Sequence, residues 1–469
     1  QFYEARSKGV PNEDLPPRPQ HWDILRAINP AALPGYNGLL INFWQVRDQQ
    51  AEVLTLLLDL FSKTPNDVDN ATEAWKHLDK VNGWGIKPIA TGQQLYNPDQ
   101  GKGQNRLKSD GLSIGNQDNF WLIEWLKAVG FYEAALTRLV LGGKDRKTFV
   151  VTPRELSYEA NRKVMNAFHD RMNWAETSTR FDILAAIRYA DTLLDYFTSE
   201  ETTFARLMQL RNIQKKVVAG FHTAFYKDLG NAVATMNIAF IALPGWIVIR
   251  SREDVQIYRS LLEEIEAVTR QFDESHSDAF TLLQYLRDFV SGDDLEAFFR
   301  FTNAFPAYYM GMRERGKYAQ QFSTGFIERL IMSTEPKLSP ILDSEGFRNI
   351  AYAIRQSTIT AQYRKAQGDR KYDVRYGLGQ ELSRKARYPE QFIAELSDFL
   401  HKYNAENAQV METRPGPYRR SIQTSDIDEI VSLIDEFGSE TVAKLLIAYG
   451  YARVPREDSL PQEEEEIAS

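Results

Sequence analysis

Cations set in loops rich in glycine, asparagine and proline are the residues of this chain whose chemistry is easiest to anticipate. The first such loop is Asn97–Gly111. Three cations project from it: Lys102, Arg106 and Lys108. Glycine and asparagine tolerate positive φ, so a loop of this composition lets its backbone approach a ligand closely and could hold an anion. A second basic turn, Gly142–Lys147, leads into Thr148–Pro153, whose β-branched and aromatic residues indicate a strand.

A third basic segment, Gly346–Tyr388, contains 10 Lys or Arg residues and 3 acidic residues. Residues 389–469 contain 7 basic and 17 acidic residues, so charge is segregated along a chain whose net charge is −8. Between Tyr363 and Tyr376 the cations are interleaved with tyrosines. Cations neutralise phosphates and aromatic rings stack on unpaired bases, a combination that suits a displaced single strand. A plain solvated basic face fits the composition equally well.

The motifs that would indicate an enzyme are incomplete. A phosphate-binding loop at Gly101-Lys102 needs a glycine five residues earlier and Ser or Thr after the lysine, but Tyr96 and Gly103 occupy those places. His169-Asp170 is a pair that some metal-dependent phosphohydrolases use, but a lone pair favours a surface position on a helix. The chain contains no cysteine, which excludes disulfides and thiolate zinc sites, and its six histidines lack ligand spacing. No metal and no cofactor is expected.

Helices dominate the elements that must position these residues. Apolar periodicity indicates helices at 120–129, with Gly130 as the stop, and at 160–169, 178–197, 204–225, 255–272 and 279–290. Strands are expected at 148–153, 236–241 and 246–250. A capping box at Ser425 begins a helical hairpin that is interrupted by Gly438. We therefore expect an α+β, predominantly helical protein.

Two domains are expected within the 469 residues. The first is a mixed α/β domain at 1–343, and the second is a helical bundle at 344–469 with a solvated acidic tail at Glu463–Glu466. The sequence contains no run of about 18 apolar residues, so no membrane span is expected. No signal-like segment is visible after Gln1, so a cytoplasmic protein without membrane contact is expected.

Several short stretches spread along the chain resemble those of a known family. They are His21-Trp22-Asp23, the Asn97–Gly111 loop, Phe120–Tyr132, Lys144–Lys147, Tyr372–Leu378 and Ala448–Arg453. Together they resemble the large subunit of type I CRISPR surveillance complexes (Cascade), closest to the subtype I-B-like group. The resemblance implies a non-enzymatic subunit whose N-terminal α/β domain recognises the motif flanking the target, near the 5′ end of the guide RNA. It implies a C-terminal bundle that helps hold the displaced strand.

The resemblance also implies partners. These are guide RNA, target DNA, the backbone, guide-end and small subunits of the complex, and a recruited nuclease or transposition protein. Sequence specificity would then come mostly from guide pairing. The negative net charge fits this family poorly, although the basic segments fit it well.

We expect three groups of residues to contact nucleic acid. Lys102, Asn105, Arg106 and Lys108 would contact the duplex beside the target, with Asn105 reading a base edge. Lys144, Arg146 and Lys147 would hold phosphate or guide RNA. The displaced strand would follow Arg355, Arg364, Lys365, Arg370, Lys371, Arg375, Arg384, Lys385 and Arg387.

Two other functions remain open at this point. One is a metal-dependent nuclease that uses His169 and Asp170, which divalent-ion-dependent cleavage by the isolated chain would favour. The other is a helical adaptor without nucleic-acid contact, in which the basic segment docks acidic partners.

Overall fold

The computed structural model describes residues 2–16, 20–62, 68–96, 119–172, 175–199, 201–210, 216–230, 233–413, 416 and 418–454. The chain divides into two compact units. The first unit comprises Gln1–Ser178 and Val218–Ile241, and the second unit comprises Thr179–Val217 and Ala242–Ser469. The expected boundary at 343 and 344 lies inside the second unit. Interactions cross it there, for example the 2.9 Å hydrogen bond that Gln362 Nε2 donates to the carbonyl of Met310.

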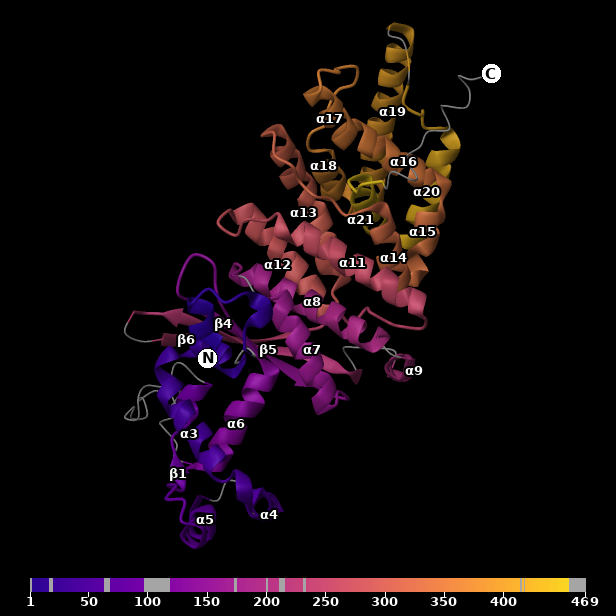
Figure 1. Cartoon of the computed structure of the whole chain (residues 1–469). Coiled ribbons are helices and arrows are strands. Elements are labelled where there is room, and N and C mark those ends of the chain that lie inside the picture. Colours follow the sequence, from indigo (N-terminus) through magenta and orange to yellow (C-terminus); the bar gives the residue numbers. More distant parts are fainter. Residues whose placement is uncertain are drawn as a thin grey trace, which may run out of the picture. The chain divides into compact units, whose positions relative to one another are not determined.

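Most elements of the first unit are helices (Figure 1). They are α1 Phe2–Ser7, α2 Gln20–Ile28, α3 Leu33–Gln45, α4 Gln50–Ser62, α5 Val68–Asn82, α6 Trp121–Ala134 and α7 Tyr158–Arg171. Helices α2 to α6 share one hydrophobic core, whose centre is aromatic. The ring of Trp75 lies 5.4 Å from that of Trp84 and 5.2 Å from that of Trp121, and the Trp75 indole donates to the carbonyl of Ile86. Aromatic burial of this kind supplies much of a core's stabilisation.

Helix α6 is longer than the sequence predicts, because it continues through Gly130 to Ala134. A glycine inside a helix costs about 1 kcal/mol relative to alanine. The residues that follow more than compensate, since Tyr132 is buried and its hydroxyl donates to the carbonyl of Leu95 over 2.6 Å. Tertiary packing therefore overrides the stop signal at Gly130.

The first unit also contains two small antiparallel sheets. The larger has the order β3-β4-β5-β6, with β3 Ala135–Leu139, β4 Arg146–Pro153, β5 Val218–Asp228 and β6 Val233–Ala242. In the smaller sheet, β1 (Ile89–Ala90) pairs with β2 (Asn119–Phe120). The strand predicted at 148–153 is confirmed as part of β4, and the one at 236–241 as part of β6. The α+β, predominantly helical fold class is confirmed as well.

The helix predicted at 204–225 is wrong in its second half. Helix α9 (Glu201–Leu210) occupies the beginning of that range, but Val218 starts strand β5. Phe221 packs there between Phe149 of β4, 5.9 Å away, and Phe168 of α7, 5.7 Å away. The apolar residues of this segment fit the period of a helix as well as that of a strand, and pairing with β4 favours the strand.

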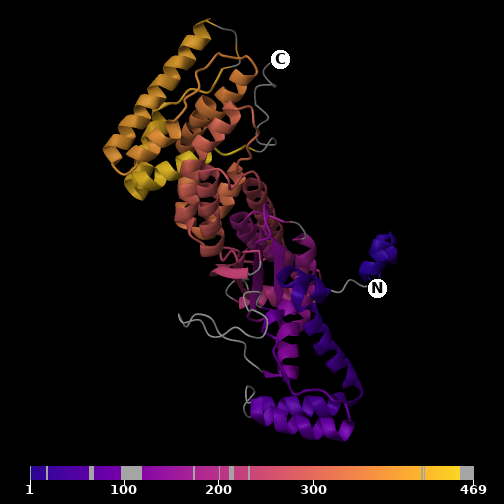
Figure 2. The same ribbon diagram turned by 90° about the vertical axis from the view of Figure 1, so that its left-hand side faces the viewer.

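The second unit is built from helices (Figures 1 and 2). They are α8 Ser178–Thr198, α9, α11 Arg252–Arg270, α12 Ser277–Gly292, α13 Leu295–Glu314, α14 Thr324–Thr334, α15 Ser339–Asp343, α16 Glu345–Arg355, α17 Ala361–Ala366, α18 Leu378–Lys385, α19 Pro389–Thr413, α20 Thr424–Phe437 and α21 Ser439–Gly450. Among the described residues, no helix is both long and apolar enough to cross a membrane.

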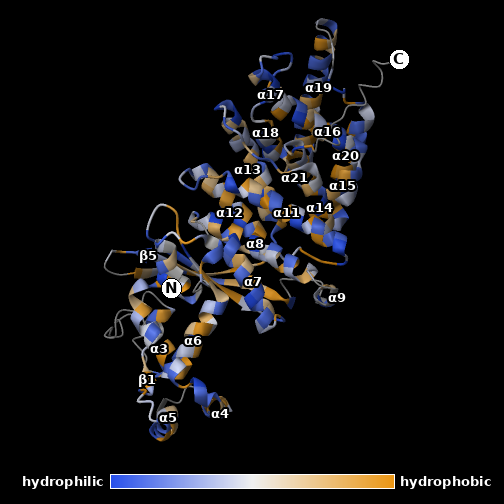
Figure 3. Cartoon of the chain, in the orientation of Figure 1, coloured by the Kyte–Doolittle hydropathy of each residue, from blue (hydrophilic) through white to orange (hydrophobic). Residues whose placement is uncertain are grey.

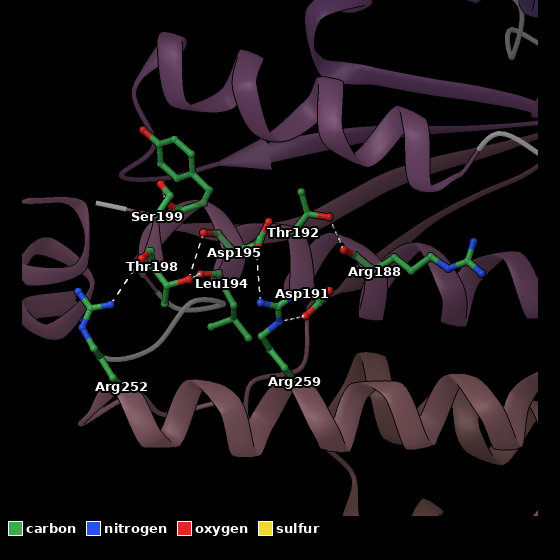
Figure 4. A network of polar contacts seen from close by, with 10 residues as sticks. Arg188, Asp191, Thr192, Leu194, Asp195, Thr198, Ser199, Arg252 and Arg259 are labelled. Atoms are coloured by element: carbon green, nitrogen blue, oxygen red, sulfur yellow. Dashed lines mark hydrogen bonds and ion pairs between the residues drawn. The ribbon is translucent and has the colours of Figure 1, made fainter. Parts of the chain in front are cut away.

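Ion pairs join α8 to α11. Figure 4 shows Arg259 of α11 between Asp191 and Asp195 of α8, at 2.7 and 3.0 Å. At a second place along the same two helices, the buried Arg188 of α8 pairs with Glu266 of α11 over 2.8 Å. These ion pairs connect the two helices at two places along their length.

The helical hairpin at the C-terminal end is confirmed as α20 and α21, with Gly438 between them at φ +83°. Its capping box starts earlier than expected, because Gln423 rather than Ser425 is the N-cap. Asp426 supplies the reciprocal bond, accepting from the backbone N–H of Gln423 over 2.8 Å.

Candidate nucleic-acid interface

The predicted motif-reading residues Lys102, Asn105, Arg106 and Lys108 lie outside the described residues. The chain on either side of them is tied together in the first unit. Ile89 pairs with Phe120 in the small sheet, and the backbone N–H of Trp121 donates to the carbonyl of Pro88 over 2.9 Å. The described segments before Asn97 and after the Asn97–Gly111 loop are therefore hydrogen-bonded to each other within the first unit.

The second basic turn connects β3 to β4 and uses Gly142 at φ +95°. Lys144 is exposed there, on the wall of a hollow of about 360 Å³ that Lys227 and Asp228 also line. The guanidinium of Arg146 lies 3.9 Å from the Asp228 carboxylate, and little of its side chain is exposed. Lys144 is consequently the cation of this turn that a phosphate could reach most easily.

Lys147 points to the opposite side of β4 from Arg146, as neighbours on a strand do. Its side chain is buried, and its ammonium donates to the carbonyl and to the hydroxyl of Ser178 over 3.1 and 3.3 Å. To contact phosphate or guide RNA, Lys147 would have to give up these bonds. In this structure Lys147 joins β4 to Ser178, both within the first unit.

Arg355 has a comparable structural role at the end of α16. Its guanidinium donates to the carbonyls of Ala452 and Tyr449 over 2.9 and 2.5 Å. These carbonyls belong to the last turn of α21 and the residues after it, which a cation satisfies well. Burial lowers the pKa of Arg355 to about 10. The Arg355 guanidinium therefore connects α16 to α21 and is not free to contact nucleic acid.

The other predicted cations of the third segment lie on α17, on α18 and in the connections after them (Figure 1). Lys365, Arg370, Arg384 and Arg387 are exposed, and Arg364, Lys371, Arg375 and Lys385 are half-buried. Figure 3 shows that this part of the second unit is mostly hydrophilic. The structure therefore exposes half of these eight cations and partly buries the other half.

Three tyrosines are exposed among these cations. Tyr363 is 50% exposed, Tyr376 44% and Tyr388 54%. The Lys365 ammonium lies 5.5 Å from the centre of the Tyr376 ring, and the Arg387 guanidinium 6.0 Å from that of Tyr388. We call the exposed residues Tyr363, Lys365, Arg370, Tyr376, Arg384, Arg387 and Tyr388 the cation–tyrosine surface.

A π-helical turn shapes the start of this surface. Residues Gln356–Thr360 continue α16 as a π-helix before α17 begins. The carbonyl of Ser357 accepts a 2.7 Å hydrogen bond from the backbone N–H of Arg375, which fixes the loop between α17 and α18. π-turns are rare and often occur at functional sites. The π-helical turn was not predicted from the sequence. The cluster of hydroxyl residues at 357, 358 and 360 is the sequence feature that weakly indicates it.

The same loop is held from its other side by Arg419, which the sequence reasoning also missed. The Arg419 guanidinium lies over the rings of Tyr372 and Tyr403, and it pairs with the Glu406 carboxylate over 2.6 Å. Tyr372 is buried by these contacts. It is thus a packing residue and does not belong to the cation–tyrosine surface.

Carboxylates border the surface near Arg375. A hollow of about 380 Å³ is lined there by Arg375, Glu381, Glu395 and Lys402, among others. Lys402 is paired with Asp398 at 2.5 Å. Acidic residues on this side repel phosphates, so this hollow suits an anion less well than the side of Lys365 and Arg387 does.

His169 serves the structure of the first unit. Its Nε2 lies 2.9 Å from the carbonyl of Ala135, and its own carbonyl accepts from Arg138 over 3.2 Å. In the described part of the chain, no three His, Asp or Glu side chains gather in a way that could hold a metal ion.

Comparison of the chain with protein families, with curated proteins and with solved structures found no match. Its function must therefore be argued from its own residues.

Proposed function

We propose that this chain is a non-catalytic large subunit of an RNA-guided DNA-targeting complex of the type I CRISPR kind. It would recognise the motif that flanks the target and stabilise the displaced strand, in the cytoplasm. The observation that carries the proposal is the cation–tyrosine surface, where exposed tyrosine rings and exposed cations share one segment of the second unit.

Both parts of this surface suit an unpaired strand. Each cation that neutralises a phosphate releases a counterion, and each ring that stacks on a base contributes about 1–3 kcal/mol. Paired bases inside a duplex offer no such face to a tyrosine. Tyrosine rings also anchor protein interfaces, so Tyr363, Tyr376 and Tyr388 fit the adaptor function as well, and the strand-binding measurements below separate the two functions.

The other roles rest on the sequence. Lys102, Asn105, Arg106 and Lys108 would contact the duplex beside the target, and Lys144 and Arg146 would hold phosphate or guide RNA. The partners would be guide RNA, target DNA, the other subunits of the complex, and a recruited nuclease or transposition protein.

The test is an electrophoretic shift of a guide-matched duplex by the reconstituted complex, with and without this chain, across a panel of flanking trinucleotides. We expect tight binding that needs the chain and varies with the flank. Binding that is indifferent to the chain, or to the flank, contradicts the motif-reading role.

The strand-holding role has its own measurement. Permanganate oxidises unpaired thymines, so the thymines of an open displaced strand react unless bound protein protects them. The triple variant Tyr363→Ala, Tyr376→Ala, Tyr388→Ala should reduce protection without changing the flank preference. Tyr158→Ala is the matched control, since Tyr158 is 65% exposed on the first unit and outside the surface. Equal protection with both variants would remove the strand-holding role.

A further inference from the structure

Strand β6 is the last strand of the four-stranded sheet (Figure 1), so one of its two edges has no strand beside it among the described residues. Natural proteins usually protect such an edge with a charged residue, a proline, a bulge or a very short strand. Strand β6 has 10 residues, none of which is charged and none of which is proline or glycine. A long and uncharged edge of this kind is suited to pairing with another strand.

One face of β6 is apolar and exposed. The side chains of Met236, Ile238 and Phe240 alternate along the strand and share this face, and all three are exposed, Ile238 at 72%. We call these three residues the apolar row. The Phe240 ring lies 5.2 Å from the ring of the exposed His222 on β5, whereas the neighbouring Phe221 packs against α7. The apolar row therefore lies on the face of the sheet opposite to α7.

The backbone groups of the apolar row point away from β5. The hydroxyl of Thr223, on β5, donates to the carbonyl of Ala239 over 3.3 Å, so this carbonyl faces β5. Successive residues of a strand direct their backbone groups to opposite sides. The N–H and C=O groups of Met236, Ile238 and Phe240 consequently face the outer edge. Exposed apolar side chains and outward backbone groups thus occur at the same positions.

The sequence of β6 has the symmetry that pairing with itself requires. Two identical antiparallel strands are related by a two-fold axis, so residues equally far from a central residue face each other. Every second residue from Ala234 to Ala242 is small, large, isoleucine, large and small in turn, with Ile238 at the centre. Met236 then faces Phe240 of the second copy, and a methionine beside an aromatic ring is a favourable pair. The strand therefore fits a second copy of itself.

Charge favours the same meeting point. The chain has a net charge of −8, so two copies repel each other unless they meet through a neutral surface such as β6. We propose that two copies of this chain associate through β6, antiparallel about Ile238, so that their four-stranded sheets form one continuous sheet. The two apolar rows exchange about six N–H···O=C bonds and join on one face. This inference is independent of the proposed function, because it involves no nucleic acid.

Sedimentation velocity of the full chain tests the association. A strand edge is smaller than a standard protein interface, so we expect a monomer–dimer equilibrium at concentrations between about 1 and 100 µM. Ile238→Lys places two ammonium groups opposite each other at the two-fold axis and should leave the chain monomeric. Ile238→Glu should do the same. An equimolar mixture of the two variants should restore the dimer, since a lysine then faces a glutamate.

Leu58→Lys is the matched control. Leu58, on α4, is 69% exposed, so this variant introduces the same charge at an exposed apolar position outside the sheet. It should dimerise as the wild type does. Because Ile238 and Leu58 are both exposed, both variants should keep the circular dichroism spectrum of the wild type. Loss of the dimer in Ile238→Lys is then not a loss of the fold.

The register has its own test. The chain contains no cysteine, so one introduced cysteine is its only thiol. Ile238→Cys should give a covalent dimer on mild oxidation, because residue 238 faces itself with Cα atoms about 5.5 Å apart, within the range of a disulfide. Met236→Cys alone should not, since its two copies lie about 14 Å apart along the paired strands. A mixture of Met236→Cys and Phe240→Cys should give the covalent dimer again.

Three results contradict this inference. A wild type that stays monomeric at the highest concentration removes the second copy as the occupant of the β6 edge. Loss of the dimer in Leu58→Lys, with Ile238→Lys unaffected, moves the interface to α4. Equal cross-linking of Ile238→Cys and Met236→Cys shows that the strands do not pair about Ile238.

Discussion

The guanidinium of Arg419 lies 3.7 Å from the ring centre of Tyr372, which joins the residues before α20 to the loop between α17 and α18. The same guanidinium donates to Asn407 over 2.8 Å and to Glu406 over 2.6 Å, and only 1% of its side chain is exposed. One buried cation therefore satisfies several groups at once.

Arg419→Ala should destabilise the protein by about 3 kcal/mol, because it leaves Glu406 and Asn407 without their partner in a buried place. Urea unfolding followed by circular dichroism measures this. The neighbouring Arg420→Ala is the matched control. Arg420 is exposed and pairs with the exposed Glu345, so its loss should cost less than about 1 kcal/mol. Equal effects of the two variants would contradict the structural role of Arg419.

The cations of the cation–tyrosine surface should determine the salt dependence of strand binding. Replacing Lys365, Arg370, Arg384 and Arg387 by glutamine should lower the slope of log affinity against log salt concentration by about 3, since each phosphate contact contributes about 0.7 for single strands. Fluorescence anisotropy titrations of a fluorescein-labelled single strand of 15 thymidines between low and physiological salt measure the slope. Lys76→Gln, an exposed cation on α5, should leave the slope unchanged.

Gly346, in the first turn of α16, has no room for a side chain. A Cβ there would lie 2.7 Å from the carbonyl oxygen of Asp426 and 2.9 Å from the Cβ of Glu429. Gly346→Ala should therefore cost about 2 kcal/mol by forcing α16 and α20 apart. In contrast, a Cβ on Gly311 of α13 would meet nothing within 4 Å, so Gly311→Ala should stabilise by up to about 1 kcal/mol. Urea midpoints of the two variants should move in opposite directions.

Glu266 should make stability depend on pH. Burial alone would raise its pKa, but hydrogen bonds and charge from Arg188, together with Arg270, lower it below the ordinary glutamate value. Because the folded pKa is below the unfolded one, the carboxylate stabilises the fold at neutral pH. This contribution is lost as the pH falls below about 4.3 and through the lowered folded pKa.

Glu266→Gln should accordingly unfold at lower urea than the wild type at pH 7, and the gap should narrow toward pH 3.5. Glu263→Gln, on the exposed side of the same helix, controls for the substitution itself. A gap that stays constant with pH would show that the Glu266 charge is not its cause.

Helices with a clear apolar period could be predicted from the sequence. The ranges expected for α8 and α11 agree with the structure within a few residues, because each buries one continuous face. Strand β5 could not be predicted in this way. Its partner strand β4 lies far earlier in the chain, and no local pattern at Phe221 reports a distant neighbour.

The candidate site shows the same limit. Lys147, Lys365 and Arg355 are all basic in the sequence, yet of the three only Lys365 is exposed in the structure. What separates them is the position of carbonyl groups, those of Ser178 for Lys147 and of Tyr449 and Ala452 for Arg355. These acceptors come from other elements, so composition alone cannot reveal which cations are already bonded.

The interrupted path of the chain through the first unit has a consequence for biosynthesis. Strands β3 and β4 leave the ribosome well before β5 and β6, and residues of the second unit are made in between. At about 5–20 residues per second, the 65 residues from the end of β4 to the start of β5 take roughly 3 to 13 seconds, and the free edge of β4 waits that long for its partner. A nascent chain terminated before Val218 would therefore keep that edge open, and this product is the one that chaperones and proteases should recognise.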